Sequence, residues 1–449
     1  MKLFYDIKDK PKFPQLVVYA IQQLLAIMAA TLVVPIIIGN GMQPSAALFG
    51  AGIGTLIYVA FTKANSPVFL GSSFAFLGSM GAAFAGAVSA QAGYAGIILG
   101  AIFAGLVYVV IALTVKFVGV GWIDKLMPKQ VIGPTVAIIG LSLAGNAIGD
   151  LQAGKYMVDG VSTAHPLVAI ACGLVTLFVT MICSTYGKKS IKLIPFIIGI
   201  LSGYAFAVIV TLIGTKTGND ALKLIDFSVF SGISLFALPE FTFLTAMKGI
   251  KEIDGAYIGT IAAAYLPVAF VVFAEHIADH KNISSIIGKD LLKEPGLHRT
   301  LLGDGVGSMV GAFFGGCPNT TYGESVACVA LTRNASVYTI ITAAVGAILI
   351  AFLQPFVAFV DSIPSCVMGG VCMALYGFIA VSGLKMVQGV NLEDNKNLYT
   401  VSVILIAGIG GLTLNFGKIT ITSIACALIL GIITNLILAK GKAPVEDAE

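Results

Sequence analysis

The feature that most constrains this chain is a pair of acidic residues at the end of an apolar run that is too short to cross a membrane. Ile261–Ala274 contains 14 residues and no charged side chain, whereas a membrane-spanning helix needs about 20. A spanning helix must therefore continue through Glu275 and Asp279 toward Ile287. Because these acids are four residues apart, they lie on one face of that helix. In the alternative, the apolar helix ends at Ala274 and both acids are ordinary solvated residues at its end.

A carboxylate inside the hydrocarbon layer is costly unless it faces protein or water. On insertion scales, a charged side chain at the centre of a helix costs at least about 2.5–3.5 kcal/mol. Acids that are kept at such a depth usually mark a substrate or proton pathway. The stretch Ala274–His280 therefore predicts a transport pathway.

The composition places the whole chain in the membrane. Of its 449 residues, 57% are hydrophobic and only 11% are charged, whereas soluble domains carry about 25% charged residues. The lysines lie at the ends of apolar segments and the net charge is only +4, so nucleic acid is not an expected partner. The histidines and cysteines lack the spacing of a closed zinc site, so neither a metal nor another cofactor is expected. No serine or cysteine has a base beside it, which argues against an enzyme.

The apolar stretches predict an all-α polytopic membrane protein with fourteen membrane segments. A more polar connection, Thr215–Leu238, divides them into seven and seven. Because seven is odd, the second half would cross the membrane in the opposite direction, as in transporters built from inverted repeats. The predicted segments are Leu16–Ile38, Ala46–Phe61, the stretch around Gly71–Phe76, Tyr94–Val115, Val131–Ile148, Pro166–Thr185, Leu193–Ile213, the acidic helix, Leu301–Gly315, the stretch that begins at Cys317, Tyr338–Val360, Cys366–Ser382, Leu398–Leu412 and Ile419–Leu438.

The third segment of each half is irregular. Gly71–Phe76 is a patch of small and polar residues, and Asn319–Glu324 occupies the corresponding place in the second half. In inverted-repeat transporters, broken segments at matching positions mark the binding site near the membrane midplane. We therefore expect these two stretches to face each other there, with Glu275 beside them.

The basic residues predict that both termini are cytoplasmic and that the protein lies in the cell (inner) membrane. With this orientation, all but six of the 26 Lys and Arg residues fall in cytoplasmic loops or ends, as the positive-inside rule requires. The six on the outer side are Lys155, Lys216, Lys223, Lys248, Lys251 and Lys418.

A glycine-rich stretch near the start of the ninth segment, Gly303–Ser308, looks like a phosphate-binding loop. No strand precedes it, and such a loop is meaningful only between a strand and a helix. Glycine also recurs every four residues from Gly303 to Gly315. This pattern is typical of the small-residue stripe that lets membrane helices pack closely.

Five groups of motifs occur in a characteristic order along the chain. They are Gln22 with Ala29-Ala30-Thr31, then Gly71–Phe76, Ala274–His276, Lys289–Leu292 with Pro295–Arg299, and Asn319–Glu324. Together they resemble the nucleobase–ascorbate transporter family (nucleobase:cation symporter-2), and within it the bacterial uracil permeases. The resemblance extends over nearly the whole chain.

The resemblance implies fourteen helices in two intertwined repeats, with short extended strands in segments three and ten. Segments 1–4 and 8–11 would form a core domain, and segments 5–7 and 12–14 a gate domain. A homodimer would be in keeping with the family. The implied boundaries are 1–15 for a cytoplasmic N-terminal tail, 16–115 and 236–360 for the core domain, 116–235 and 361–440 for the gate domain, and 441–449 for a cytoplasmic C-terminal tail.

The resemblance also implies the residues of the site. A nucleobase would lie between the two strands, and its N–H groups would donate to carboxylates while its carbonyl groups accept from backbone N–H groups of a broken helix. The implied substrate-binding residues are Glu275, Glu324, Phe74, Tyr322, Gly323 and Ala30. Proton coupling is assigned to Glu275, Asp279, His280 and Tyr376. The expected coupling ion is the proton, with Na⁺ left open.

Three residues depart from the family pattern. Asp279 stands where the uracil permeases have a histidine, as it does in xanthine-type members. Ser325 replaces an asparagine, and Gln23 replaces the histidine of a Gln-His pair. Restoring asparagine at 325 is expected to harm binding less than Glu324→Gln does.

The predicted function is proton-coupled uptake of uracil or a close pyrimidine base. A purine permease for xanthine or urate is the main alternative. A passive channel is a second alternative, but a channel needs a continuous polar pore, whereas the polar residues here cluster at one depth.

Overall fold

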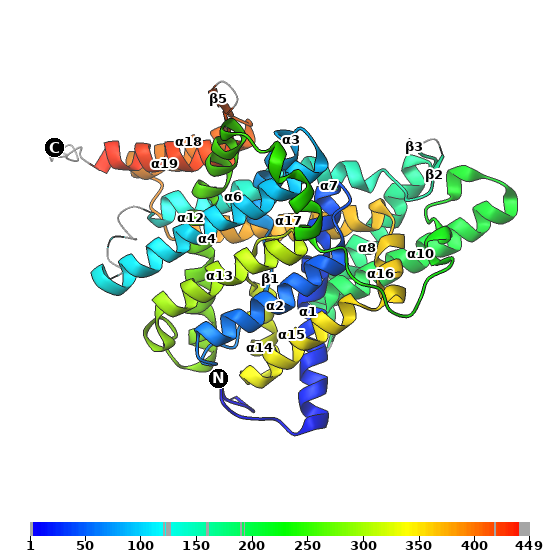
Figure 1. The fold of residues 1–449 in the computed structure, drawn as a ribbon, viewed down its shortest axis with the longest axis horizontal. Coiled ribbons are helices and arrows are strands. Elements are labelled where there is room, and N and C mark those ends of the chain that lie inside the picture. The colour runs from blue at the N-terminus through cyan, green and yellow to red at the C-terminus, as the bar shows by residue number, and fades with distance from the viewer. Residues whose placement is uncertain are drawn as a thin grey trace.

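The computed structural model describes residues 3–119, 122, 127–158, 161–188, 191–192, 194–416 and 419–439. Lys418 and the predicted tail 441–449 lie outside these ranges. Within them, eight helices are long and apolar enough to span a membrane, so the chain is a multi-pass membrane protein (Figure 1). These are α1 (Phe13–Ile38), α2 (Pro44–Phe61), α4 (Ala90–Val118), α6 (Lys129–Ser142) with α7 (Ala144–Leu151), α8 (Pro166–Tyr186), α10 (Pro195–Thr217), α12 (Gly255–Ile287) and α17 (Ser365–Val387).

Shorter elements connect and complete these helices. The other α-helices among the described residues are α3 (Leu77–Ala85), α11 (Thr242–Gly249), α13 (Leu297–Gly315), α14 (Gly323–Thr332), α15 (Val337–Ala351), α16 (Gln354–Ser362), α18 (Asn395–Ile409) and α19 (Ser423–Ala439). Single turns of other helix types are η1 (Phe74–Phe76), η2 (Asp220–Leu222), η3 (Phe227–Phe230), η4 (Ile250–Glu252) and η5 (Leu292–Gly296).

In the part of the chain that the structure describes, six short strands form three antiparallel pairs, β1 with β4, β2 with β3 and β5 with β6. The last two pairs were not anticipated from the sequence, because each strand has only two or three residues. The strands are β1 (Leu70–Ser72), β2 (Met157–Val158), β3 (Val161–Ser162), β4 (Asn319–Thr321), β5 (Leu414–Phe416) and β6 (Ile419–Ile421).

The helix that carries the two acids is continuous. Helix α12 extends without a break to Ile287 and contains Glu275 and Asp279 in its interior. The side chain of Asp254 caps its first turn by accepting a hydrogen bond from the Tyr257 N–H (2.7 Å). The prediction that the helix continues past the apolar run is confirmed, and the alternative in which it ends at the last apolar residue is wrong.

Two predicted segments are each divided between two helices in the structure, and a third, Ile419–Leu438, begins with β6 (Ile419–Ile421) before α19. Val131–Ile148 contains the boundary between α6 and α7, which meet at Leu143. Tyr338–Val360 is divided into α15 and α16, with Pro355 in the first turn of α16. Proline lacks a backbone N–H and disfavours helical geometry in the residue before it, so α15 cannot continue through this point.

The helices pack into two groups, each with members from both halves of the chain. In the first group, α2 packs against α13 and α15, α4 packs against α12 and α13, and α1 packs against α15. In the second group, α17 packs against α6, α7 and α8, while α18 and α19 pack against each other and against α6. Figure 1 shows α8 and α10 at the right of the view, apart from α2 and α13.

The glycine stripe of α13 forms the contact with α2. A Cβ added to Gly307 would lie 2.9 Å from the Gly54 carbonyl oxygen, and one added to Gly315 would lie 2.5 Å from the Ala46 carbonyl oxygen. Both distances are shorter than ordinary contacts between non-bonded atoms. Only glycine permits this approach, and the packing interpretation of the stripe is confirmed.

Candidate functional site

Strands β1 and β4 place the two irregular segments side by side in the interior. The ladder is extended at both ends, because the Ser73 N–H donates to the Pro318 carbonyl (2.9 Å) and the Tyr322 N–H donates to the Phe69 carbonyl (3.2 Å). A helix begins directly after each strand, so two helix N-termini meet near the pair. The register places Leu70 opposite Thr321, Gly71 opposite Thr320 and Ser72 opposite Asn319.

The absence of a side chain at Gly71 leaves room for the ring of Tyr322 on the opposite strand segment. A Cβ on this glycine would lie 2.4 Å from Cζ of the tyrosine ring. The Tyr322 hydroxyl donates a hydrogen bond to the Ser72 carbonyl (2.7 Å). The ring therefore occupies the space that a side chain at residue 71 would fill.

A cavity of about 420 Å³ lies beside the strands, between the two helix groups. Three carboxylates line it: Glu275 and Asp279 from α12, and Glu324 from the first turn of α14. Most of the remaining wall is aromatic or apolar, but it also contains the lysine Lys192 from the segment before α10. Other lining residues are Leu25 and Ala26 of α1, Phe74, Val136 and Ile139 of α6, Phe196 of α10, Thr320, Thr321, Tyr322 and Gly323, and Leu375, Phe378 and Ser382 of α17.

Local contacts hold the acids at the strand end of this cavity. The Thr321 hydroxyl donates a hydrogen bond to Oδ2 of Asp279 (2.8 Å). Oδ1 of the same carboxylate would lie 3.8 Å from a Cβ built on Gly323, next to Glu324 in sequence. The position of Glu324 near the positive end of α14 favours a negative charge there. The site therefore combines carboxylate acceptors with backbone N–H donors of a helix N-terminus.

Most of the residues predicted for the site line this cavity, but three do not. Ala30 is buried in α1 outside the lining. Tyr376 is not among the lining residues, but its ring forms a T-shaped contact with that of the lining residue Phe74, with centroids 6.3 Å apart. The third, His280, belongs to a separate buried network. Within the described ranges, no cluster of three or more His, Cys, Asp and Glu residues could hold a metal ion.

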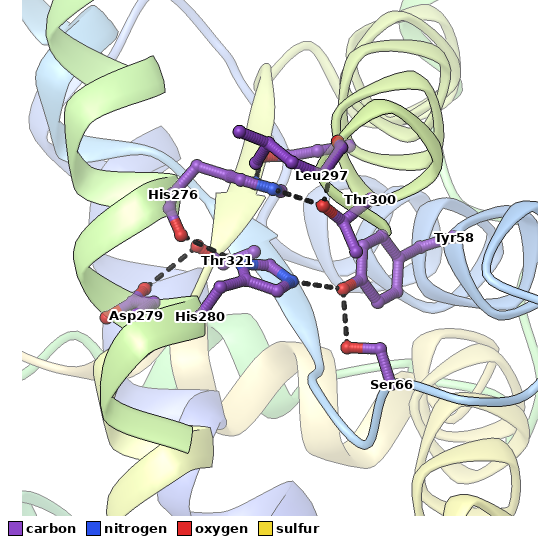
Figure 2. Close-up of polar contacts among 9 residues, drawn as sticks. Tyr58, Ser66, His276, Asp279, His280, Leu297, Thr300 and Thr321 are labelled. Carbon is purple, nitrogen blue, oxygen red and sulfur yellow. Dashed lines mark hydrogen bonds and ion pairs between the residues drawn. The ribbon is translucent and has the colours of Figure 1, made fainter. Parts of the chain in front are cut away.

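The donor and the acceptor in each hydrogen bond of His280 can be assigned from its partners (Figure 2). Its Nδ1 lies 2.8 Å from the His276 carbonyl, which can only accept, so Nδ1 carries hydrogen. Nε2 of a neutral ring then accepts from the Tyr58 hydroxyl (2.6 Å). The oxygen of Tyr58 in turn accepts from the Ser66 hydroxyl (2.7 Å). The ring is thus tied to α2 and the loop that follows it.

His276 connects α12 to α13. The Thr300 hydroxyl donates its hydrogen to the Leu297 carbonyl (3.1 Å), so Nε2 of His276 donates to Thr300 (2.9 Å). Nδ1 of His276 lies 2.7 Å from Oδ2 of Asp304, and both side chains are at most 1% exposed. One proton is therefore shared between this nitrogen and the carboxylate. The ring also stacks on that of His280, with centroids 4.0 Å apart.

Sequence reasoning missed this network. It treated Gly303–Ser308 only as a packing stripe, although the stretch contains Asp304. An acid within a membrane segment needs a partner, and a histidine on a neighbouring membrane helix could have supplied it. Asp304 and His276 are 28 positions apart, so no local spacing marks them as a pair.

Comparison with known proteins places the chain in a family. Residues 14–416 match a family described as the Permease family. The chain belongs to this family. Relatives of this permease include the uracil permease of Bacillus caldolyticus, which is 38% identical over 445 residues that cover 98% of this chain and 96% of the relative. The uracil permease of Bacillus subtilis strain 168 is 37% identical, with 99% and 98% covered, and that of Escherichia coli K12 is 35% identical, with 96% and 93% covered. The resemblance seen in the sequence motifs is thereby confirmed.

Solved structures of other membrane transporters share the fold of this permease. The transmembrane domain of the cyanobacterial bicarbonate transporter BicA has a TM-score of 0.62 at 15% identity, with 96% of this chain and all of that chain covered. SLC26A9 has a TM-score of 0.65 at 11% identity, with 96% of this chain and 66% of that chain covered. At such low identity the likeness concerns the fold alone.

Proposed function

We propose that this permease carries uracil or a closely related pyrimidine base into the cell by proton-coupled symport. The observation that carries the proposal is the meeting of Glu275, Asp279 and Glu324 in one cavity beside two helix N-termini. Its volume of about 420 Å³ is within the range of small-molecule sites. The names of the similar permeases from three bacteria support uracil as the substrate.

The polar groups of the cavity match the polar groups of uracil. The base has two N–H donors, for which Glu275 and Glu324 are acceptors on opposite sides of the site. Its two carbonyl groups need donors, and the first N–H groups of α14 have no partner within the helix. The rings of Phe74 and Tyr322 supply apolar faces for the planar base. Glu275 binds the base in this scheme and also carries or senses the proton.

Asp279 has a different role in the proposal. It lies one helical turn from Glu275 on the same face of α12, so the titrations of the two acids are linked. Its hydrogen bond to Thr321 ties it to β4, which lies at the base site. Asp279 thus relays the proton, whereas Glu275 contacts the base.

The place of the cavity between the two helix groups supports transport by alternating access. We assign the first group to a core domain (16–115 and 236–360) and the second to a gate domain (116–235 and 361–440). Relative motion of the domains would open a fixed site to either side of the membrane. We further propose that both termini are cytoplasmic, that the protein lies in the cell membrane and that it forms a homodimer.

The proton role is tested with purified protein in liposomes. Asp279→Asn should still exchange labelled uracil across the membrane but should not concentrate it under an imposed proton gradient, because exchange needs no net proton movement. Glu275→Gln should lose both activities. Asp150→Asn is the matched control, because this acid in α7 does not line the cavity. If Asp279→Asn accumulates uracil as wild type does, with the same pH dependence, the relay through Asp279 is wrong.

The substrate is tested by competition. Asp279, the residue found in xanthine-type members, favours a purine permease as the second candidate. Unlabelled uracil, thymine, xanthine and urate should be compared as competitors of labelled uracil uptake. Stronger competition by xanthine or urate than by uracil would replace the pyrimidine assignment. Counterflow exchange of labelled base would distinguish a carrier from a passive channel.

A further inference from the structure

Two of the residues that depart from the family pattern meet in one buried junction. Nε2 of Gln23, in α1, donates a hydrogen bond to the hydroxyl oxygen of Ser325, in α14. The backbone N–H of Phe69, which leads into β1, donates to the same oxygen (3.0 Å). All three residues are at most 2% exposed. A single hydroxyl group therefore joins α1, the start of β1 and the first turn of α14.

The junction adjoins the cavity but forms no part of its lining. Ser325 directly follows Glu324, so the position of the hydroxyl group and that of the carboxylate are coupled through one turn of α14. The Phe69 carbonyl accepts from the Tyr322 N–H (3.2 Å), which ties the same junction to the residue that follows β4. Movement at Ser325 would therefore move the carboxylate proposed to hold the base.

We propose that Gln23 and Ser325 are a size-matched pair of positioning residues that sets the place of Glu324 in the cavity. The inference rests on the proposed function, because it concerns how firmly the base is held. Serine is short, and the long glutamine side chain reaches it across the junction. Asparagine at 325 is larger and would meet Gln23 and the Phe69 backbone in a space that is already filled, because interiors are close-packed.

The two departures therefore compensate for each other. Sequence reasoning alone predicts only that Ser325→Asn harms binding less than Glu324→Gln does, because it restores the usual residue of the family. The buried junction predicts that this substitution is clearly harmful while Gln23 remains. Gln23→His alone is harmful for the opposite reason, since the shorter ring leaves the Ser325 hydroxyl without its side-chain partner. Only the double variant has a matched pair again.

A double-mutant cycle tests the pair. The dissociation constant for uracil is measured on purified wild type, Gln23→His, Ser325→Asn and the double variant. Each single variant should weaken binding about tenfold, equivalent to about 1.4 kcal/mol, and the double variant should return to within about threefold of wild type. Singles that bind like wild type, or a double variant as weak as the two effects combined, would overturn the proposal.

Two further measurements separate positioning from general damage. Ser202→Asn in α10 is the matched control for adding an amide side chain away from the cavity, and its affinity should be that of wild type. Ser325→Ala removes the shared acceptor without adding volume, so it should weaken binding and change the affinity ratio of uracil to thymine. A lower melting temperature with an unchanged dissociation constant and ratio would show a structural role only, which contradicts positioning.

Failure of the proposed function gives a different result. If wild type binds no pyrimidine base, that function is wrong, and the cycle is measured with the base that wins the competition experiment. The pair is then judged by the same criterion, recovery in the double variant. Should a single variant fail to fold, Gln23→Asn with Ser325→Ala replaces it, and additive effects on affinity would again refute the pairing.

Discussion

A methyl group at Gly311 should displace the strand that frames the cavity. The Cβ of Gly311→Ala would lie 2.3 Å from Nδ2, 2.4 Å from Cγ and 2.6 Å from Oδ1 of Asn319, the first residue of β4. Carbon atoms in favourable contact are about 3.5–4.0 Å apart, so the amide must move by about 1 Å. Asn319 is enclosed on its other side too, because a Cβ on Gly54 would lie 2.4 Å from the same Nδ2.

The change in the free energy of unfolding combines two destabilising contributions and one stabilising contribution. Overpacking costs about 1–3 kcal/mol. Asn319 Nδ2 also donates to the Gly50 carbonyl (3.1 Å), and the loss of that buried hydrogen bond costs about 1–3 kcal/mol more. Replacing glycine by alanine in a helix returns about 1 kcal/mol. We therefore expect a net destabilisation of about 1–5 kcal/mol, with weaker base binding because β4 carries Thr321 and leads to Glu324.

The assay is thermal unfolding of detergent-purified protein together with uracil binding. Gly377→Ala is the matched control, since a Cβ on this glycine of α17 meets no atom within 4 Å. It should melt at the wild-type temperature or slightly above it and should bind normally. If Gly311→Ala matches this control in both measurements, the argument that β4 is wedged against α13 is refuted.

Two further predictions concern contacts away from the cavity. Tyr58→Phe should lower the melting temperature, because His280 and Ser66 lose their buried partner at a cost of about 1–3 kcal/mol; an unchanged melting temperature would show that the network does not stabilise the fold. Near the N-terminus, the hydrogen bond from Lys289 (2.6 Å) lowers the pKa of Asp6. A lowered pKa means that the contact stabilises the terminal segment above the ordinary Asp value of about 3.9 and is lost as pH falls below it. Hydrogen exchange should therefore show that this exposed ion pair stabilises the segment by about 0.2–1 kcal/mol. The stabilisation should decrease on acidification and should be absent in Lys289→Gln. Equal acid dependence of exchange in both proteins would exclude the ion pair as its cause.

The membrane class, the continuity of α12 and the presence of acids within it could all be predicted from the sequence. These properties follow from local quantities. Fourteen apolar residues cannot cross the hydrocarbon layer, so the helix had to include Glu275 and Asp279. The spacing of glycines in α13 likewise determined which face could approach another helix, because only residues without a side chain permit contact between backbones.

The contacts between residues far apart in the sequence could not be predicted and become visible only in the folded chain. The register that places Leu70 opposite Thr321, the proton-sharing pair of Asp304 and His276 and the junction between Gln23 and Ser325 join parts of the chain that no local pattern connects. Hydropathy and helical period show which residues are buried, but a buried polar group can be satisfied by any donor or acceptor that packing brings within about 3 Å. Which partner this is depends on how the helices pack around the strand pair.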